Sequence, residues 1–136
     1  MILSKSIEYA LKSLVLIKYQ STNITITDIS NKLDIPKNYT SKILLNLVKK
    51  NYITSQKGPG GGFKPLDYTN TIKELITDID GEFRYDRCVM GLSNCSDDNP
   101  CPLHDHFKNI KKSILCDFME LTIDEICKNP DKVLKL

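Results

Sequence analysis

The fold of this chain is decided by residues 27–51, TDISNKLDIPKNYTSKILLNLVKKN. Thr27 is a residue type that caps helices, so the sequence predicts a short helix that starts there and ends at Leu33. A second helix is predicted from Pro36, a residue suited to the first helical position, to about Asn51. Two helices joined by so short a turn predict a helix-turn-helix, whose second helix enters the major groove of DNA.

One side of the predicted second helix is polar and basic, whereas the other side is apolar. Helix N-termini attract phosphate, and side chains that reach into the groove read base edges. From their places in the motif, base contacts are expected from Lys37, Asn38 and Ser41, and phosphate contacts from Thr27, Tyr39 and Lys42.

The segment after the second helix changes to the pattern of a β-hairpin. Residues 52–55 and 63–65 are predicted to form two short strands around the loop of residues 56–62, QKGPGGG. Glycine allows positive φ and close backbone approach, so Gly60 is an expected DNA contact in this loop. The loop lacks the spacing of a phosphate-binding P-loop and lies between strands. Helices and hairpin together predict a winged helix.

Length and hydropathy bound the class of protein. With 136 residues, the chain is long enough for one compact domain, or for a small DNA-binding head with a second element docked on it. No apolar run reaches the roughly 18 residues that a membrane helix needs. Residues 4–19 have the pattern of an amphipathic helix and not of a signal peptide. A soluble, cytoplasmic protein is therefore expected.

The charge is unevenly distributed along the chain. The net charge is +2, but residues 1–66 carry ten lysines and arginines against three acids, whereas residues 67–136 carry nine against fourteen. A basic half suits a nucleic acid, because each phosphate that it neutralises releases condensed counterions. On charge alone, a solvated surface fits equally well.

The second half of the chain is predicted to hold helices separated by an irregular stretch. Thr71 is expected to cap a helix that ends at Gly81, and helical spacing resumes at Pro102. The long helix that follows has one apolar stripe, formed by Phe107, Ile110, Ile114, Leu115, Phe118 and Met119. A single stripe has little to pack against in so small a chain, so a two-fold dimer interface is expected. Thr122 to Glu125 has the form of a capping box, which predicts a short last helix.

The expected fold is therefore mainly α with a small β-hairpin, a winged helix-turn-helix followed by a long dimerisation helix. Three regions are expected: a DNA-binding domain at residues 1–80, a cysteine loop at residues 81–101, and the dimerisation and C-terminal helices at residues 102–136.

Three of the five cysteines fall within the irregular stretch. Cys88, Cys95 and Cys101 have C-x6-C-x5-C spacing and are followed by His104 and His106. Thiols stay reduced in the cytoplasm, so metal ligands, redox-active thiols or core residues are expected instead of disulfides. Soft thiolates favour an iron-sulfur cluster or zinc. The wide spacing favours the cluster, because zinc sites usually have cysteines two to four residues apart.

The residue types alone leave alternatives open. Three cysteines on a loop also fit plain reduced thiols without a ligand. Cys116 and Cys127 fall in predicted helical segments, and each is expected to be a small buried hydrophobe.

Three motifs together resemble the Rrf2 family of bacterial transcription regulators: IPKNYTSKIL at residues 35–44, GPGGGF at residues 58–63, and the three-cysteine loop with its trailing histidine. Their order and spacing extend the resemblance from Leu3 to about Glu125. The family includes an iron-sulfur regulator of cluster biogenesis, nitric-oxide-sensing repressors, and iron- or redox-responsive members. A branch that regulates cysteine metabolism lacks the three cysteines, so this chain is more similar to the cluster-binding branches.

The resemblance implies an iron-sulfur cluster held by Cys88, Cys95 and Cys101, with 2Fe–2S favoured over 4Fe–4S. The family supplies a fourth ligand in two ways. One is a histidine three residues after the last cysteine, which is His104 here. The other is an acid on the first helix of the partner subunit, which maps to Glu8. A carboxylate is a harder and weaker ligand than imidazole for such iron, so ligation by Glu8 implies a cluster that is more easily lost.

The resemblance also implies a homodimer that binds a pseudo-palindromic DNA operator, with the long helices paired across the two-fold axis and each cysteine loop near the partner's first helix. In cluster-binding relatives an arginine often opens the wing. Lys57 stands at this place, and lysine is less favoured than arginine in a narrow minor groove.

The expected function is that of a regulator and not an enzyme. Its sequence-specific DNA binding is expected to be controlled by an iron-sulfur cluster that responds to iron, redox state or nitric oxide. The first alternative is a thiol- or zinc-dependent regulator of the same fold. A small metalloenzyme or an electron carrier is a more distant alternative, because a carrier does not need a basic winged helix and the sequence offers no convergent polar groups for an active site.

Overall fold

The computed structural model describes residues 3–20, 22–93 and 95–128 of the chain. This part of the chain is mainly helical with a two-stranded antiparallel hairpin, which confirms the predicted fold class. In chain order, the elements are α1 (Lys5–Tyr19), α2 (Ile26–Leu33), α3 (Lys37–Lys49), β1 (Ile53–Gln56), β2 (Gly62–Pro65), α4 (Ile72–Asp80), α5 (His104–Ser113), the π-helical turn η1 (Ile114–Phe118) and α6 (Ile123–Cys127).

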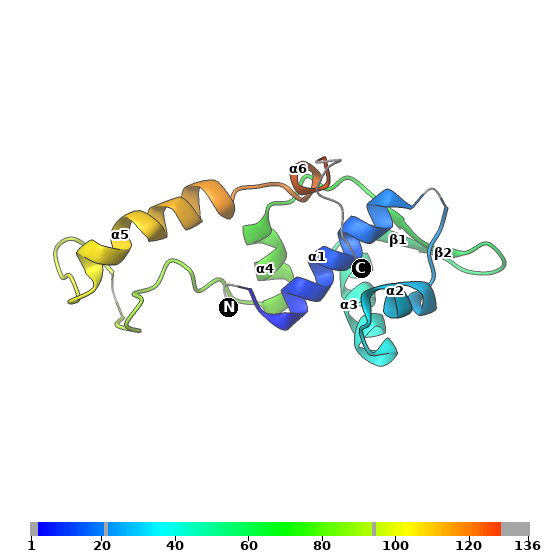
Figure 1. Cartoon of the computed structure of the whole chain (residues 1–136), viewed down its shortest axis with the longest axis horizontal. Coiled ribbons are helices and arrows are strands. Elements are labelled where there is room, and N and C mark those ends of the chain that lie inside the picture. Colours follow the sequence, from blue (N-terminus) through cyan, green and yellow to red (C-terminus); the bar gives the residue numbers. More distant parts are fainter. Residues whose placement is uncertain (1–2, 21, 94, 129–136) are drawn as a thin grey trace.

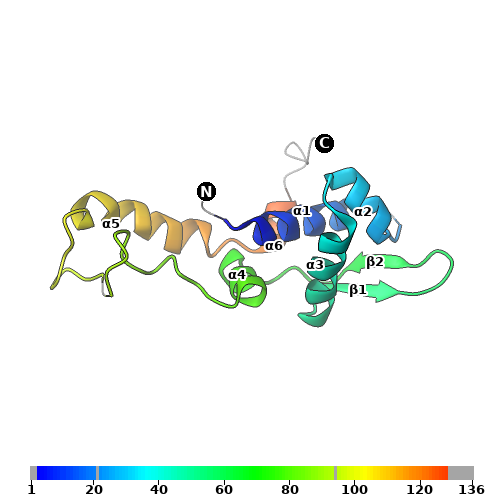
Figure 2. The ribbon, with the colours of Figure 1, turned by 90° about the horizontal axis from the view of Figure 1, so that it is seen from below.

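The molecule is elongated (Figures 1 and 2). A head is formed by α1 to α4, α6 and the hairpin, and the loop of the hairpin extends from one end of it. From the other end extend α5 and the irregular loop before it, which lie side by side in both views. The wing and the cysteine loop are therefore at opposite ends of the long axis.

The core of the head forms where α1 crosses α3 and α4. Leu14 of α1, Leu44 and Leu47 of α3, and Leu75 of α4 have no exposed surface. Each such side chain contributes about 1.5–3 kcal/mol by burial, so these contacts hold α3 firmly in place. The hydroxyl of Tyr52, just before β1, adds a hydrogen bond to the Asp78 carboxylate of α4 at 2.8 Å.

The hairpin is completed by a short contact with the segment before α2. β1 and β2 pair with Ile53 opposite Pro65. Ile24 pairs with Phe63 on the other edge of β2, and the Phe63 N–H donates to the Ile24 carbonyl at 2.8 Å. This approach leaves no room for a side chain at Gly62, where a Cβ atom would lie 2.6 Å from the Ile24 oxygen. Gly62 also has a positive φ of +139°. The last glycine of the loop is therefore required for the close packing of β2 against Ile24.

The start of α2 differs from the prediction. Thr25 is the cap: its Oγ1 accepts a hydrogen bond from the Asp28 N–H at 3.2 Å, and the Asp28 carboxylate accepts from Thr25 in return. The prediction that Thr27 caps this helix is wrong, because Thr27 lies inside the first turn. This capping box satisfies amide groups that the helix itself leaves free.

The predicted limits of α3 are nearly correct. Pro36 precedes the helix by one residue, and the helix ends at Lys49, shortly before the predicted end. Asn51 has a left-handed φ of 64°, which stops the helix and turns the chain into β1. The predictions that Thr71 caps α4 and that Gly81 ends it are confirmed.

After η1 the chain returns to the head and pairs with the segment before α4. The Ile72 N–H donates to the Leu121 carbonyl at 2.9 Å, and the Asp124 N–H donates to the Tyr68 carbonyl at 2.8 Å. Met119 is fully buried in the head. The predicted capping box of Thr122 with Glu125 opens α6.

The apolar stripe of the long helix is exposed over much of its length. Ile110 is 54% exposed and Phe118 is 36% exposed. In η1 the Met119 N–H donates to the Ile114 carbonyl five residues back, at 2.8 Å. This wider turn rotates Met119 away from the stripe and into the head.

The remaining cysteines differ from each other. Cys127 is buried, as predicted, whereas Cys116 is exposed, so the prediction of a buried Cys116 is wrong for the single chain. Cys116 lies on η1, which extends beyond the core of the head. Among the described residues, no helix has the length and apolar character needed to cross a membrane.

Candidate metal centre and nucleic-acid interface

The loop of residues 81–103 carries the three cysteines that were predicted to be ligands. Cys88 and Cys101 are buried and Cys95 is half-buried, although most of the loop around them is exposed. Lys111 of α5 donates a hydrogen bond to the backbone carbonyl of Asp86 and so attaches the loop to the helix beside it. The loop therefore folds inward around its thiols.

Cys88 and Cys101 are neighbouring thiols, and each affects the pKa of the other. Hydrogen bonds from the backbone amides of Met90 and Leu92 lower the pKa of Cys88, although burial opposes them. Burial and the neighbouring Cys88 raise the pKa of Cys101. Cys88 is thus the member of the pair that more readily becomes a thiolate, the form that binds metal.

Cys95 belongs to a second pair, with the histidine that begins α5. The Sγ atom of Cys95 lies 3.6 Å from Nδ1 of His104. The Nε2 atom of His104 lies 3.1 Å from a carboxylate oxygen of Asp97, which Lys108 also contacts. The hydrogen bond from Lys108 lowers the pKa of Asp97. A carboxylate that holds one ring nitrogen and leaves the other directed at the ligand position is typical of metal-binding histidines.

The donor set of this loop fits a soft metal centre in its chemistry, since three thiols and one imidazole suit iron-sulfur clusters and zinc. As the side chains stand, no three His, Cys, Asp or Glu residues in the described part of the chain are gathered closely enough to hold a metal ion. Cys101 is nevertheless within electrostatic range of both Cys88 and Cys95. The structure therefore places Cys95 beside His104 and Cys88 near Cys101, but it does not gather the four side chains around one point.

The alternative fourth ligand lies elsewhere. Glu8 is on α1, within the head, whereas residues 95–101 are near the far end of the long axis (Figure 1). Its carboxylate forms an ion pair with Lys5 at 3.3 Å. His106 is exposed on α5. Within one chain, His104 is thus the candidate fourth ligand that accompanies the cysteines.

Most of the residues of α3 that were predicted to contact DNA, by base or by phosphate, lie on the open side of this helix. Lys37, Asn38 and Lys42 are exposed. Ser41 is half-buried, and its hydroxyl donates to the Lys37 carbonyl at 3.0 Å. This bond satisfies the donor of Ser41 within the helix, and the hydroxyl oxygen keeps acceptor capacity.

Thr27 and Tyr39, the other predicted phosphate contacts, differ in their surroundings. Thr27 is exposed near the start of α2. The Tyr39 hydroxyl forms a hydrogen bond with the Ser6 hydroxyl at 2.9 Å, and its ring stands edge-on to Tyr9 with 5.5 Å between centroids. Tyr39 therefore ties α3 to the first turns of α1, a role that the sequence did not reveal.

The predicted contacts in the wing are both exposed. Lys57 opens the loop. Gly60 has a φ of +72°, and its carbonyl accepts a hydrogen bond from the side-chain amide of Asn23 at 3.0 Å. The same amide donates to Gln56 at 3.2 Å. Asn23 thus holds the base of the wing from outside the hairpin.

Two features of these surfaces were missed in the sequence. The acid Asp97 lies seven residues before His104 on an irregular loop, so no periodicity links the two residues. Leu45 is exposed on α3, and the prediction assigned it to neither side of the helix. Helical spacing would have shown that Leu45 lies about 100° around the helix from Leu44, away from the buried side.

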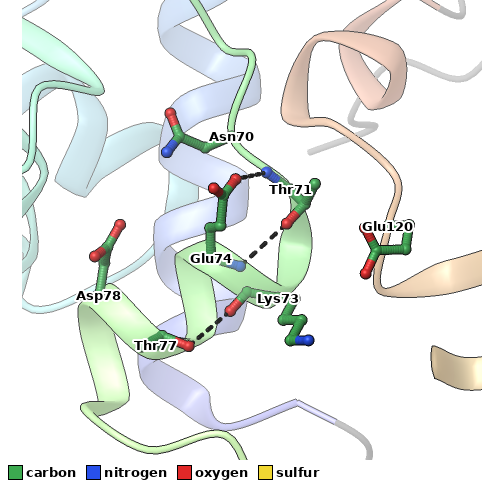
Figure 3. A pocket seen from close by; sticks show the side chains of 7 residues that line it. All are labelled: Asn70, Thr71, Lys73, Glu74, Thr77, Asp78 and Glu120. Carbon is green, nitrogen blue, oxygen red and sulfur yellow. Dashed lines mark hydrogen bonds between the residues drawn. The ribbon is translucent and has the colours of Figure 1, made fainter. Parts of the chain in front are cut away.

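A shallow polar recess of about 480 Å³ lies between α4 and the segment before α6 (Figure 3). It is lined by Asn70, Thr71, Lys73, Glu74, Thr77, Asp78 and Glu120. Several of these groups serve α4 itself. Thr71 and Glu74 form its capping box, and the Thr77 hydroxyl donates to the Lys73 carbonyl at 3.0 Å. The polar groups of this recess therefore serve mainly to cap and stabilise α4. The thiol and imidazole groups that suit a soft metal lie on the cysteine loop instead.

Comparison with solved structures supports the winged-helix fold. CymR of B. subtilis, described as the global cysteine regulator, superposes with a TM-score of 0.70 over 93% of this chain and 96% of that one, at 13% identity. IscR of T. potens superposes with a TM-score of 0.66 over 99% of this chain and 93% of that one, at 14% identity.

Comparison of sequences gives the family. The chain is 29% identical to the transcriptional regulator NsrR of Bacillus licheniformis, over 95% of this chain and 94% of that protein. It is 26% identical to the transcriptional regulator IscR of Yersinia pseudotuberculosis, over 82% of this chain and 69% of that protein. These relatives are regulators, which confirms the prediction that the chain is not an enzyme. A profile of the Rrf2 family, described as iron-dependent transcriptional regulators, matches residues 3–129. The chain therefore belongs to the Rrf2 family of transcriptional regulators.

Proposed function

We propose that this regulator binds a pseudo-palindromic DNA operator as a homodimer and that an iron-sulfur cluster, with 2Fe–2S favoured, controls the binding. Cys88, Cys95 and Cys101 would hold the cluster, and either His104 or Glu8 of the partner subunit would complete the ligand set. The observation that carries this proposal is the contact of Cys95 with His104, beside a loop that also holds the neighbouring thiols of Cys88 and Cys101. The iron-dependent description of the family supports it.

The chain's own residues supply the environment for such a group. Asp97 orients the ring of His104, and the amides of Met90 and Leu92 stabilise a thiolate at Cys88. When bound, a cluster supplies iron that responds to redox state and to nitric oxide.

Contacts within the head offer a connection from the cysteine loop to the DNA-reading helix. The Ser4 hydroxyl, at the start of α1, donates to the Asp80 carboxylate at the end of α4, where the loop begins, at 2.8 Å. Two residues further along, Ser6 contacts Tyr39 of α3. A change in the position of the loop would therefore act on the N-terminal part of α1, and through Tyr39 on α3. This is a regulatory link only if the two ligation states bind DNA differently.

The direct experiment is anaerobic purification followed by visible absorption and by iron, sulfide and zinc analysis. Iron and sulfide in equal amounts are expected in the wild-type protein and in Cys116→Ser, which removes an exposed thiol outside the loop. Cys95→Ser is expected to lose both. Colourless wild-type protein without iron, even after reconstitution, would contradict the proposal.

The fourth ligand is tested by His104→Ala and Glu8→Ala, made separately. The variant that removes the true ligand is expected to change the visible spectrum and to accelerate loss of iron, whereas the other keeps the wild-type spectrum. Unchanged spectra in both variants would exclude both residues.

Control of DNA binding by the cluster needs a separate measurement. The affinity for a selected DNA duplex is measured at fixed salt with the cluster bound and after its removal, because electrostatic affinity depends strongly on salt. A difference of at least tenfold is expected. Equal affinities with and without the cluster would contradict control by the cluster, but not DNA binding itself.

A second candidate is a thiol-dependent regulator without a cluster, which the proximity of the Cys88 and Cys101 thiols favours. Treatment with diamide would join the two sulfurs in a disulfide, with two protons and two electrons passing to diamide. Mass spectrometry of the non-reduced peptides detects this bond. Iron-free wild-type protein whose DNA affinity changes when the disulfide forms would favour this candidate, and zinc without iron would favour a zinc-dependent regulator.

A further inference from the structure

Leu45 is an apolar side chain on the open side of α3. It is 65% exposed, more than any other large hydrophobic residue in the part of the chain that the structure describes. A single exposed leucine is ordinary on a protein surface, so the significance of Leu45 depends on which residues surround it. The neighbouring Leu44 and Leu47 are fully buried in the head.

The position of Leu45 on the helix coincides with the predicted DNA-reading surface. Residues four apart lie above one another on a helix, so Leu45 lies between Ser41 and Lys49. Asn38 and Lys42 flank this row, and a recess of about 440 Å³ is lined by Asn38, Tyr39, Ser41, Lys42 and Leu45. Leu45 is therefore the apolar centre of a polar and basic surface.

The charge around Leu45 indicates what covers it. Lys42 and Lys49 lie three and four residues from Leu45 along α3, Lys37 lies nearer the start of the same helix, and all three are exposed. A second copy of the chain docked on this surface across a two-fold axis would bring the same lysines together, which is unfavourable. A polyanion neutralises them. In the major groove of DNA, the apolar group that base edges present is the 5-methyl group of thymine.

We propose that Leu45 contacts a thymine methyl group in the major groove and thereby specifies thymine at one position of each half-site. This inference rests on the DNA-binding part of the proposed function and does not depend on a cluster. Leu45 would complement Lys37, Asn38 and Ser41, which offer only polar groups to base edges.

The test uses deoxyuridine, which differs from thymidine only by the missing methyl group. A binding duplex is first selected from a random-sequence library with the full chain, both as purified anaerobically and after iron removal. Each thymine of the selected duplex is then replaced singly by deoxyuridine, and Kd is measured by fluorescence anisotropy at fixed salt. At one thymine per half-site, the wild-type protein is expected to bind about fourfold more weakly without the methyl group, the value for one buried carbon.

Three variants make this result specific. In Leu45→Ala, the thymine and deoxyuridine duplexes should bind equally, whereas Leu45→Met should keep a preference for thymine. Leu121→Ala, at an exposed leucine outside α3, should behave as wild type. Circular dichroism and thermal unfolding establish that each variant is folded.

Equal affinity of the wild-type protein for thymine and deoxyuridine at every position would overturn the inference. A deoxyuridine effect that survives in Leu45→Ala would also overturn it. So would a Leu45→Ala variant that changes the oligomeric state of the protein, seen as its molecular mass in solution, and not its preference for thymine. A selection that enriches no sequence with either form of the protein would remove the DNA-binding premise as well. Loss of cluster control alone would leave the thymine effect in place.

Discussion

Gly62 shows how a single residue decides whether the wing can form. Its φ of +139° and the Ile24 oxygen 2.6 Å from the position of a Cβ atom exclude other residues without a local shift. Gly60, in the same loop, also has a positive φ of +72°, but a Cβ atom there would meet nothing within 4 Å. Substitutions at the two positions can therefore be compared to distinguish the cost of an unfavourable φ from the cost of a steric clash.

We expect Gly62→Ala to lower the free energy of unfolding by about 3 kcal/mol, because it combines an unfavourable φ with a backbone clash. Gly60→Ala should cost only about 1 kcal/mol, since it has the unfavourable φ alone. Urea unfolding monitored by circular dichroism gives both values. Equal losses in the two variants would show that the contact with Ile24 is unimportant.

The two cysteines outside the loop should differ in reactivity. Cys127 is buried, and burial raises its pKa from an ordinary 9.0 to about 11, whereas Cys116 is exposed. At pH 8 we expect iodoacetamide to modify Cys116 much faster than Cys127, because the thiolate is the reactive form. Peptide mass spectrometry over a time course measures both rates.

The same pKa shift of Cys127 has a consequence for stability. The thiol ionises near pH 9 in the unfolded chain and near pH 11 in the folded chain, so burial of the neutral thiol favours folding less as the pH rises above 9. Replacement by alanine should remove this part of the alkaline decrease in stability. A reaction rate at Cys127 equal to that at Cys116 would contradict the burial on which both expectations rest.

At the scale of elements, the start of α2 provides a matched pair of variants. Thr25→Ala removes the cap and half of the capping box with Asp28, so a loss of about 1 kcal/mol is expected. Thr27→Ala, two residues further along the chain, should change stability by less than about 0.5 kcal/mol. If Thr27 contacts phosphate, its replacement should weaken binding to all DNA sequences alike. Thermal unfolding and DNA titration separate the two effects, and a larger stability loss in Thr27→Ala would contradict the cap assignment.

The elements that were predicted well are those with a local cause. The spacing of apolar residues in α1, α3 and α4 and the turn chemistry of Gly81 depend on neighbours along the chain. At α2, two threonines compete, and only Thr25 has an acid three residues later, at Asp28. That spacing was available in the sequence and would have identified the cap.

The features that could not be predicted depend on contacts between distant segments. The π-helical turn η1 forms where Met119 enters the head and its carbonyl accepts a hydrogen bond from the Lys73 N–H. No local sequence pattern predicts this contact. The pairing of Cys95 with His104, and the contact of Asp97 with the same ring, depend on the path of an aperiodic loop. The three cysteines and His104 could be predicted as ligands because thiols and imidazoles bind soft metals. Asp97 could not, because its contact with His104 exists only in the folded loop.

At the scale of the whole molecule, the long helix is the feature that a single chain leaves incomplete. In α5, the buried residue is His104, at its first position, and the apolar residues further along remain partly or largely exposed. A stripe of this kind on a projecting helix is more stable when a second copy covers it. Dimerisation would also bring two DNA-reading helices into one molecule, which a palindromic operator requires.

We therefore expect Ile110→Glu to weaken dimerisation at least tenfold, about 1.4 kcal/mol, because a carboxylate would replace an apolar side chain at the centre of the stripe. Asn109→Glu introduces the same charge at an exposed position on another side of α5 and should leave the dimer intact. Sedimentation velocity over a range of protein concentrations gives the monomer–dimer constants. Because α5 packs chiefly against η1, both variants should keep the wild-type circular dichroism spectrum. A wild-type protein that is monomeric at all concentrations, or equal effects of the two variants, would show that the stripe is not the dimer interface.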